Sequence, residues 1–252
     1  VGEEAKRLFK DANDMLDKLS AEKTLNPRGV VGLFPANRVG DDIEIYRDET
    51  RTHVINVSHH LRQQTEKVGF ANYCLADFVA PKLSGKADYI GAFALTAGIG
   101  LQELCDKFRS EGDDYRAIMA KLLADRLTEA FAEVVHSFVR RQMWGYETGE
   151  APTPRQVIRG EYRGRRMAFG YPASPDHSLK REVFDLLAAE LTTGMKLTEN
   201  YMVDPGEALC GLLLADADYF SVGTVDTEQL LDYARRLGLD VELVKKLIPH
   251  NI

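Results

Sequence analysis

The feature that most constrains the fold is a short turn between two strand-like runs near the N-terminus. Residues 28–36 and 42–46 both have the composition of strands, and Gly40-Asp41 lies between them. Two such runs joined by a glycine-containing turn are typical of a β-hairpin. Because the strands of a hairpin pair antiparallel, this pattern weighs against a doubly wound parallel sheet.

The rest of the chain predicts further strands and one long helix. Strands are expected at residues 53–57, 88–95, 196–203, 209–214 and 219–225, and helices at 1–24, 113–143, 176–190, 227–237 and 241–247. The run at 88–95 is apolar nearly throughout, which indicates a central strand. Strands gathered in hairpins beside one long helix predict a single α+β domain with an antiparallel or mixed sheet, and not a Rossmann methyltransferase fold.

Composition excludes several classes of function. A chain of 252 residues with 44% hydrophobic content can bury a substantial core. The net charge of -7 argues against a nucleic-acid partner, whose phosphates require a basic surface. No apolar run approaches the roughly 18 residues that a membrane-spanning helix needs. Cys74, Cys105 and Cys210 form no C-x-x-C pair and indicate free thiols in a reducing cytoplasm.

The clearest chemical signal is the segment at residues 162–177, which reads YRGRRMAFGYPASPDH. Its prolines and glycines make it too irregular for a helix or a central strand, so a shaped loop is expected. A loop that combines arginine, tyrosine and exposed backbone groups suits a small ligand with a carboxylate at one end and a flat ring at the other. On composition alone, a solvated turn beside a basic patch is an equally good interpretation.

The order of residues in this segment resembles a known motif. Arg-x-x-x-Gly-Tyr-Pro-Ala begins at Arg166, follows Tyr-x-Gly and precedes Pro-Asp-His. This order resembles the S-adenosylmethionine-binding motif of the activation domain of cobalamin-dependent methionine synthase. The resemblance extends, in the family's order, over nearly the whole chain, through residues 28–38, 41–46, 124–133, 144–146, 193–199 and 219–220.

The resemblance implies a binding site for S-adenosylmethionine. It implies that Arg166 holds the ligand's carboxylate and that the backbone at Ala168 contacts the adenine. The side of the nucleoside is assigned to Tyr219 and Phe220. The expected cofactor-binding residues are Glu129, Arg166, Ala168, Gly170, Tyr171, Tyr219 and Phe220.

The long helix at 113–143 is expected to carry part of this site. At about 100° per residue its apolar stripe runs through Tyr115, Ile118, Met119, Leu122 and Ala130. Asp125, Arg126, Glu129 and Glu133 fall within this sector or at its edge, where a charge is costly unless it is paired or bound. An internal ion-pair network through Arg126 is one interpretation of Asp125 and Arg126. The resemblance assigns Glu129 to the ligand.

The resemblance also implies a function. In this family the cob(I)alamin of methionine synthase occasionally oxidises to inactive cob(II)alamin. The activation domain then presents S-adenosylmethionine for reductive methylation, while flavodoxin or an equivalent reductase supplies one electron. Tyr171 is the expected catalytic residue, near the methyl group and the corrin. Cobalamin is expected to be bound by another domain of the same polypeptide. The whole polypeptide is expected to be a cytoplasmic methyltransferase of methionine biosynthesis, and this chain alone is not expected to make methionine.

Two other classes of function stay open at this point. An independent methyltransferase needs a glycine-rich loop between strand and helix, but Gly98-Ile-Gly100 is an incomplete fingerprint and predicts only a turn. The other class is a non-catalytic structural cap on a cobalamin-binding protein. The helical pattern already present at Val1 predicts that residues 1–252 are an N-terminally truncated activation domain of a larger multidomain enzyme.

Two features near the motif have alternative interpretations. His177 either shapes the edge that faces cobalamin or caps the following helix beside Asp176. A local basic patch is either solvated or receives an acidic electron-transfer protein. The arginines of this patch are Arg155, Arg159, Arg163 and Arg165.

Overall fold

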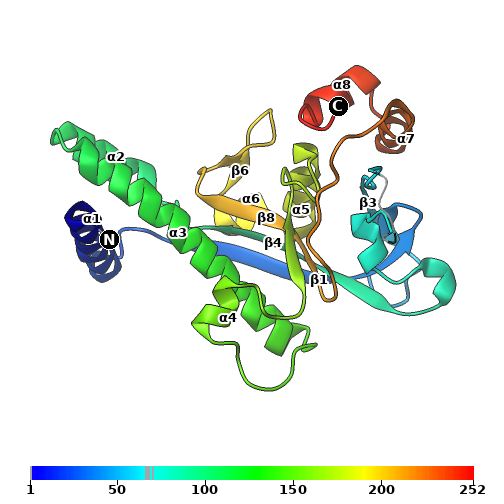
Figure 1. The fold of residues 1–252 in the computed structure, drawn as a ribbon, viewed down its shortest axis with the longest axis horizontal. Helices are drawn as coiled ribbons and strands as arrows, with labels where there is room; N and C mark the ends of the chain where they lie inside the picture. Colours follow the sequence, from blue (N-terminus) through cyan, green and yellow to red (C-terminus); the bar gives the residue numbers. More distant parts are fainter. Residues whose placement is uncertain (1, 66–68, 70) are drawn as a thin grey trace.

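A six-stranded antiparallel sheet forms the centre of the computed structural model, which describes residues 2–65, 69 and 71–252 (Figure 1). The strand order is β3-β2-β1-β4-β8-β5. The strands are β1 (Arg28–Val39), β2 (Asp42–Tyr46), β3 (Val54–His59), β4 (Asp88–Thr96), β5 (Arg165–Ala168) and β8 (Ala208–Leu214). Every pairing in this sheet is antiparallel, which confirms the predicted α+β class and excludes a Rossmann fold.

The predicted hairpin is confirmed. β1 and β2 pair up to Val39 and Asp42, so Gly40-Asp41 makes the turn, with Gly40 at a φ of 62°. The prediction that the run at 88–95 is central is also confirmed, because β4 lies between β1 and β8. Alternate residues of β4 enter two different cores, Ile90 on one face of the sheet and Phe93 on the other. Burial on both faces explains why this strand lacks a polar alternation.

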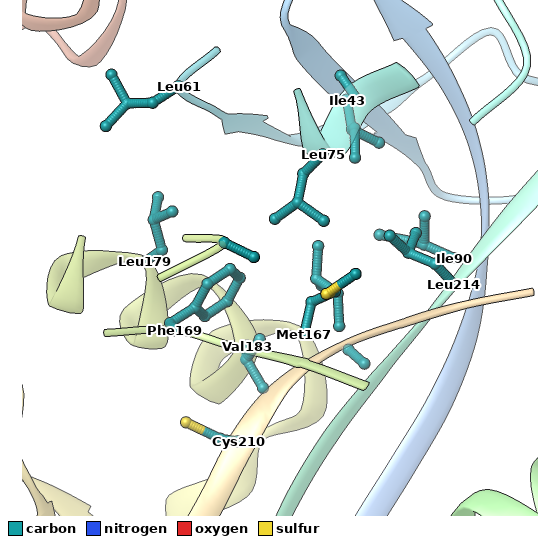
Figure 2. Close-up of a cluster of buried hydrophobic side chains, with 14 of the residues drawn as sticks. Ile43, Leu61, Leu75, Ile90, Met167, Phe169, Leu179, Val183, Cys210 and Leu214 are labelled. Atoms are coloured by element: carbon teal, nitrogen blue, oxygen red, sulfur yellow. The ribbon is translucent and has the colours of Figure 1, made fainter. Parts of the chain in front are cut away.

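Helices cover both faces of the sheet. On one face lie α5 (Lys180–Leu187), α6 (Ala189–Thr193), α7 (Thr227–Leu237) and α8 (Val241–Leu247). Their apolar side chains join the main core, where Met167 and Phe169 of the motif segment meet Val183 of α5 (Figure 2). The other face is covered by α3 (Asp114–Phe138) and the π turn η3 (Val139–Met143), which contribute Ala132 and Val139 to a smaller core. The motif segment is therefore anchored by its own apolar residues.

The predicted long helix is present, but of its predicted apolar stripe only Met119 is buried. Its N-terminus is capped by Asp113, whose carboxylate accepts a hydrogen bond from the Arg116 amide at 2.8 Å. Ile118 and Leu122 of the expected stripe are exposed. The helix instead buries a row of small residues with Met119 and His136, namely Ala117, Ala120, Ala124, Thr128 and Ala132. Small side chains at this spacing let the helix axis approach its neighbours closely, which outweighs the preference for burying larger side chains.

The interpretation of Asp125 and Arg126 as members of an internal ion-pair network is wrong. The side chains of Asp125 and Arg126 are 54% and 76% exposed, and the two groups lie 3.8 Å apart at the surface. Exposed pairs of this kind contribute about 0–1 kcal/mol. They therefore carry little of the stability of α3.

One end of the molecule is purely helical. α1 (Glu3–Glu22) and α2 (Leu101–Ser110) pack against the first half of α3 through a third core that includes Leu19, Leu104 and Ala120 (Figure 1). Val1 of the first predicted helix lies outside the described residues. α2 was not predicted, although the turn expected at Gly98-Ile-Gly100 is present and leads directly into it. The short α4 (Pro154–Ile158) was likewise not predicted.

Three predicted elements differ from the structure. The helix expected at 176–190 is divided by Ala188, which has a φ of 48° and separates α5 from α6, and it begins as the 3-10 turn η4 (His177–Leu179). The strand expected at 196–203 is a hairpin of β6 (Lys196–Leu197) and β7 (Val203–Asp204). The segment 219–225 forms no ladder; the amide of Val222 instead donates to the Pro172 carbonyl at 2.8 Å. Burial alternates along part of this segment, as it would in a strand, but the segment has no ladder partner.

The remaining elements complete the chain. The strands expected at 53–57 and 209–214 are present as β3 and β8, and the last two helices, α7 and α8, have the predicted bounds. Two further 3-10 turns, η1 (Leu75–Phe78) and η2 (Lys82–Ser84), connect β3 to β4. Among the helices of the described residues, none has both the length and the hydropathy to cross a membrane.

Candidate functional site

The site begins at the edge of the sheet, where the motif segment forms β5. The sequence predicted a shaped loop here, but Arg165–Ala168 is an edge strand paired with β8. Gly211 of β8 permits this pairing, because a Cβ at that position would overlap the backbone of Met167 and Ala168. An edge strand has N–H and C=O groups that face away from its one neighbour. The strand therefore offers backbone hydrogen-bonding groups beside the side chain of Arg166.

Directly after β5 the chain makes a tight turn. Gly170 has a φ of 85°, and a Cβ at this position would strike the ring of His177. The Gly170 amide donates to the Ser174 carbonyl at 2.8 Å. Only glycine satisfies both the left-handed backbone and the contact with the imidazole. The turn leaves Tyr171 at its tip, 49% exposed.

The position of His177 excludes one of its two interpretations. Asp176 is the residue that caps η4, since its carboxylate accepts from the Ser178 amide at 2.7 Å. Nδ1 of His177 instead lies 2.6 Å from Nζ of Lys180. Burial and the charge of Lys180 lower the pKa of His177, which favours the neutral ring. His177 therefore supports the turn at Gly170 and does not cap the helix.

A hollow of about 280 Å³ lies between β5 and α3. Its wall combines two cationic groups, one carboxylate and several aromatic rings, which come from α3, β4, β5, β8, the loops on either side of β5 and the loop that follows β8. Five of the seven predicted cofactor-binding residues line it, namely Glu129, Arg166, Ala168, Tyr171 and Tyr219. The other lining residues are Phe93, Tyr162, Arg165 and Leu209.

The two other predicted residues lie elsewhere. Gly170 lines a second hollow, of about 730 Å³, between the motif turn and the C-terminal helix α8. Phe220 is only 7% exposed and packs against Tyr73 and Phe78, with ring centroids 6.0 and 6.1 Å apart. A direct contact of either residue with a ligand stays a prediction. Tyr171 lines both hollows and so stands between them.

Arg166, a lining residue of the first hollow, is held by three neighbouring side chains. Its Nη2 forms an ion pair with Glu133, and its Nη1 lies 3.1 Å from Nδ1 of His136 and 3.5 Å from the Tyr162 hydroxyl. The Tyr162 hydroxyl in turn donates to Oε2 of Glu133 at 3.2 Å. These contacts hold the guanidinium against α3, and Arg166 is also one of the residues that line the hollow.

Burial controls the protonation of this cluster. It lowers the pKa of His136 to about 2, with help from the positive charges of Arg166 and Arg140. It also raises the pKa of Tyr162. Burial alone would lower the pKa of Arg166, but its interactions with Glu133 and Tyr162 together outweigh this effect and the pKa is raised. At neutral pH the cluster therefore contains a cationic arginine, a neutral imidazole and a neutral phenol.

Glu133, His136 and Tyr162 are site residues that sequence reasoning did not assign. Glu129, Glu133 and His136 are spaced by four and three residues, so they share one face of a helix. That spacing can be read in the sequence, but the larger apolar residues of the helix predicted a different buried face. A further hollow of about 430 Å³, between α1 and the α2–α3 hairpin, contains none of the predicted site residues.

Comparison with known proteins identifies the family of this chain. A family model described as "Vitamin B12 dependent methionine synthase, activation domain" matches residues 1–238. A crystal structure of the MetH reactivation domain bound to AdoHcy is similar to this chain, with 62% sequence identity and a TM-score of 0.96. The match covers 99% of this chain and 77% of that one. The chain belongs to the family of activation domains of vitamin B12-dependent methionine synthase.

Proposed function

We propose that this domain binds S-adenosylmethionine in the hollow beside Arg166 and presents its methyl group to a cobalamin held by another domain. One observation carries the proposal. Five residues that the motif resemblance assigns to the ligand come from three separate segments of the chain, and all five line one hollow. A relative with 62% identity is bound to S-adenosylhomocysteine, which differs from S-adenosylmethionine by the methyl group.

The residues of the hollow fit the chemistry of this ligand. The guanidinium of Arg166 suits the carboxylate, because charge-assisted hydrogen bonds from arginine are strong and directional. The exposed carboxylate of Glu129 suits the ammonium group or the ribose hydroxyls. The outer edge of β5 at Ala168 suits the adenine, with Tyr219 beside the nucleoside. The ring of Tyr171 suits the cationic sulfur through its negative face.

The second hollow suits the methyl acceptor of the reaction, cobalamin. It lies on the other side of Tyr171 and is lined by the motif turn, by the β6–β7 turn and by α8. When both ligands are present, S-adenosylmethionine supplies the methyl group and cobalamin accepts it. The side chain of Tyr171 positions the sulfonium end and excludes water from the space between the two hollows. The transfer belongs to the whole enzyme, because this domain contributes binding and orientation.

The electron donor is proposed to be flavodoxin or an equivalent reductase. Arg155, Arg159 and Arg163 of the basic patch are exposed, which supports an acidic partner. The patch is partly neutralised, since Arg163 lies 3.8 Å from Asp216.

A cytoplasmic location is supported by the three cysteines, which are all buried free thiols.

Calorimetric titration tests the proposed ligand. S-adenosylmethionine and S-adenosylhomocysteine should each bind this chain with one-to-one stoichiometry. Absence of binding by this chain and by a version extended upstream would favour the alternative function, a structural cap on a cobalamin-binding protein.

A substitution at Tyr171 tests the proposed role in reactivation. Tyr171→Ala in the full-length enzyme should slow recovery from the oxidised state well beyond its effect on S-adenosylmethionine affinity. Turnover with methyltetrahydrofolate should begin near normal and then decay. The absorbance of cob(II)alamin, followed under a constant supply of electrons, measures the recovery. Tyr115→Ala is a matched control, since Tyr115 is also 49% exposed but lies on the helical end of the molecule. Normal recovery in the Tyr171 variant would reduce Tyr171 to a packing residue.

A further inference from the structure

Two side chains of α3 hold the guanidinium of Arg166 in place. Glu133 pairs with Nη2, and Nδ1 of His136 lies 3.1 Å from Nη1. Tyr162 closes the set, because its hydroxyl contacts both Nη1 of Arg166 and the Glu133 carboxylate. The guanidinium on β5 is therefore fixed by contacts on both of its terminal nitrogens.

His136 can act in this set only as a hydrogen-bond acceptor. It is fully buried, and burial together with the arginines around it lowers its pKa to about 2, so the ring is neutral. An arginine only donates hydrogen bonds, so Nδ1 must accept from Nη1 and the ring proton must lie on Nε2. Nε2 lies 3.5 Å from the Tyr146 hydroxyl. The tautomer of His136 is thus determined by Arg166 on one side and Tyr146 on the other.

These contacts leave part of Arg166 for another group. Nε of Arg166 makes no hydrogen bond to any residue within the parts of the chain that the structure describes. The side chain lines the hollow of about 280 Å³, whereas Glu133 and His136 are not among its lining residues. A guanidinium that is already oriented loses less conformational freedom when it binds a carboxylate.

We propose that Glu133 and His136 are positioning residues that hold Arg166 in the orientation that receives the ligand's carboxylate. The inference rests on the proposed function and deepens it. The opposing possibility is that Glu133, itself a carboxylate, competes with the ligand for the guanidinium. The geometry favours positioning, because His136 and Tyr162 hold Nη1 at the same time as Glu133 holds Nη2.

Two ligands distinguish positioning from a general structural role. S-adenosylhomocysteine has the amino-acid carboxylate, and 5′-methylthioadenosine lacks it. Glu133→Gln and His136→Phe should each weaken binding of S-adenosylhomocysteine by roughly 10-fold and leave binding of 5′-methylthioadenosine unchanged. His136→Asn should recover part of the loss, because the asparagine oxygen can replace Nδ1 as the acceptor. Glu161→Gln is the matched control, since its carboxylate is exposed and lies 3.5 Å from Arg159.

A double-mutant cycle tests whether the effect passes through Arg166. In the Arg166→Ala background, Glu133→Gln should have no further effect on S-adenosylhomocysteine affinity. Tighter binding by Glu133→Gln alone would establish competition and overturn the proposal. An equal loss for both ligands would also overturn it, because a distorted fold does not discriminate between them.

The outcomes separate this inference from the proposed function. If the unaltered chain binds neither ligand, the proposed function fails and the inference fails with it. If Arg166→Ala weakens S-adenosylhomocysteine binding but the Glu133 and His136 variants do not, only the inference fails. A measurement that needs no variant is the nitrogen-15 spectrum of His136. It should show a bare Nδ1 and a protonated Nε2 down to about pH 5, and the opposite tautomer would overturn the proposal.

Discussion

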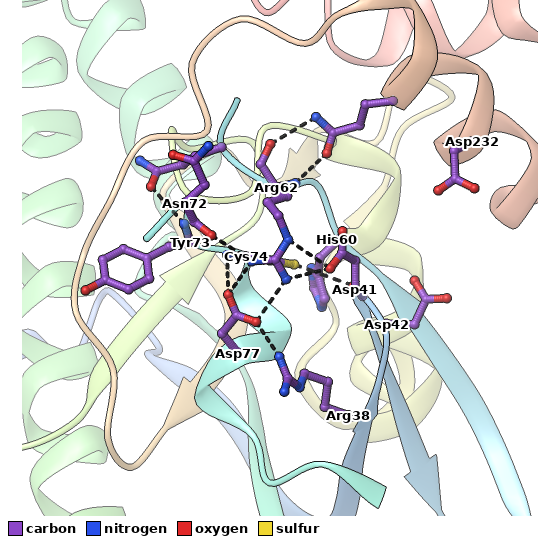
Figure 3. Close-up of polar contacts among 12 residues, drawn as sticks. Arg38, Asp41, Asp42, His60, Arg62, Asn72, Tyr73, Cys74, Asp77 and Asp232 are labelled. Atoms are coloured by element: carbon purple, nitrogen blue, oxygen red, sulfur yellow. Dashed lines mark hydrogen bonds and ion pairs between the residues drawn. The ribbon is translucent and has the colours of Figure 1, made fainter. Parts of the chain in front are cut away.

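Two arginines of this protein, Arg62 and Arg166, stand in clusters of similar composition but differ in how many of their donors are used. Arg62 makes five hydrogen bonds, to both carboxylate oxygens of Asp77, to Asp41 through two nitrogens, and to the Asn72 carbonyl (Figure 3). Those five bonds equal the full donor capacity of a guanidinium. Arg166 uses Nη1 and Nη2 but makes no contact through Nε within the described residues.

Exposure does not distinguish the two sites. The side chain of Arg62 is 30% exposed and that of Arg166 only 18%. Yet Arg62 connects the loop after β3 to η1 and to the β1–β2 turn, whereas Arg166 lines a hollow. The protein uses all five donors of the Arg62 guanidinium, whereas Nε of Arg166 has no hydrogen bond within the described residues. The number of donors in use therefore distinguishes these two arginines, which their exposed fractions do not.

The largest expected effect is on stability, at Arg62. Arg62→Ala should lower the free energy of unfolding by about 3 kcal/mol, because it leaves Asp41 and Asp77 without their main partner. Urea unfolding measures this loss. The control is Arg159→Ala, whose exposed pair with Glu161 should contribute less than about 0.5 kcal/mol. A loss below about 1 kcal/mol at Arg62 would break the comparison, since donor saturation would then not mark a structural arginine.

The second effect is on binding, at Arg166. Arg166→Ala should weaken S-adenosylmethionine binding by roughly 1.5–3 kcal/mol and should reduce ligand-free stability less than Arg62→Ala does. Arg166→Lys should recover only part of the affinity, because an ammonium cannot reproduce the planar fork. Calorimetry and urea unfolding of the same samples give both quantities. An unchanged dissociation constant for the alanine variant would remove Arg166 from the site.

The third effect is a pH dependence shared by the two regions, since each contains a buried histidine. Burial lowers the pKa of His60, near the Arg62 network, to about 3, and that of His136, near Arg166, to about 2. In the unfolded chain both titrate near 6.5. Between about pH 6.5 and 4.5 the unfolded state therefore binds more protons, and each histidine lowers stability by about 1.4 kcal/mol per pH unit as the pH falls.

One carboxyl acts in the opposite direction in this range. Burial raises the pKa of Glu182 to about 7, so the folded state binds its proton first and gains stability as the pH falls. His177, whose pKa is also lowered by burial and by the charge of Lys180, acts in the same direction as His60 and His136, so the net slope should be at least that of one histidine. Neither ring nitrogen of His60 has a hydrogen-bond partner in the described parts of the chain. His60→Leu should therefore remove the contribution of one histidine to the slope of unfolding free energy against pH, about 1.4 kcal/mol per pH unit. Unfolding at a series of pH values tests this, and an unaltered slope would mean that His60 is not buried as a neutral ring.

The smallest effect is expected at Glu129. Its side chain is exposed, and the nearby Arg126 forms its ion pair with Asp125. Glu129→Gln should therefore weaken ligand binding by about 1 kcal/mol and leave the melting temperature of the ligand-free domain unchanged. Thermal melts with and without S-adenosylmethionine measure both. A lower melting temperature without ligand would show that Glu129 supports the fold after all.

The sequence predicted the features that depend on short stretches of chain. The hairpin turn at Gly40-Asp41, the central position of β4 and the bounds of α7 and α8 all follow from local turn residues and periodicity. The order of residue types in the motif also indicated the family to which the chain belongs. Such signals are readable because a turn or a period is set by neighbours within about one or two dozen residues.

Only the tertiary structure decided which residues meet across the chain. The face that α3 buries was set by how closely small residues such as Ala124 allow it to pack, and not by its largest apolar side chains. The pairing of Arg166 with Glu133 and His136 joins positions about thirty residues apart, which no local pattern encodes. Nor could the sequence show that 219–225 lacks a strand partner, since an extended segment pairs only if an open edge lies within hydrogen-bonding distance.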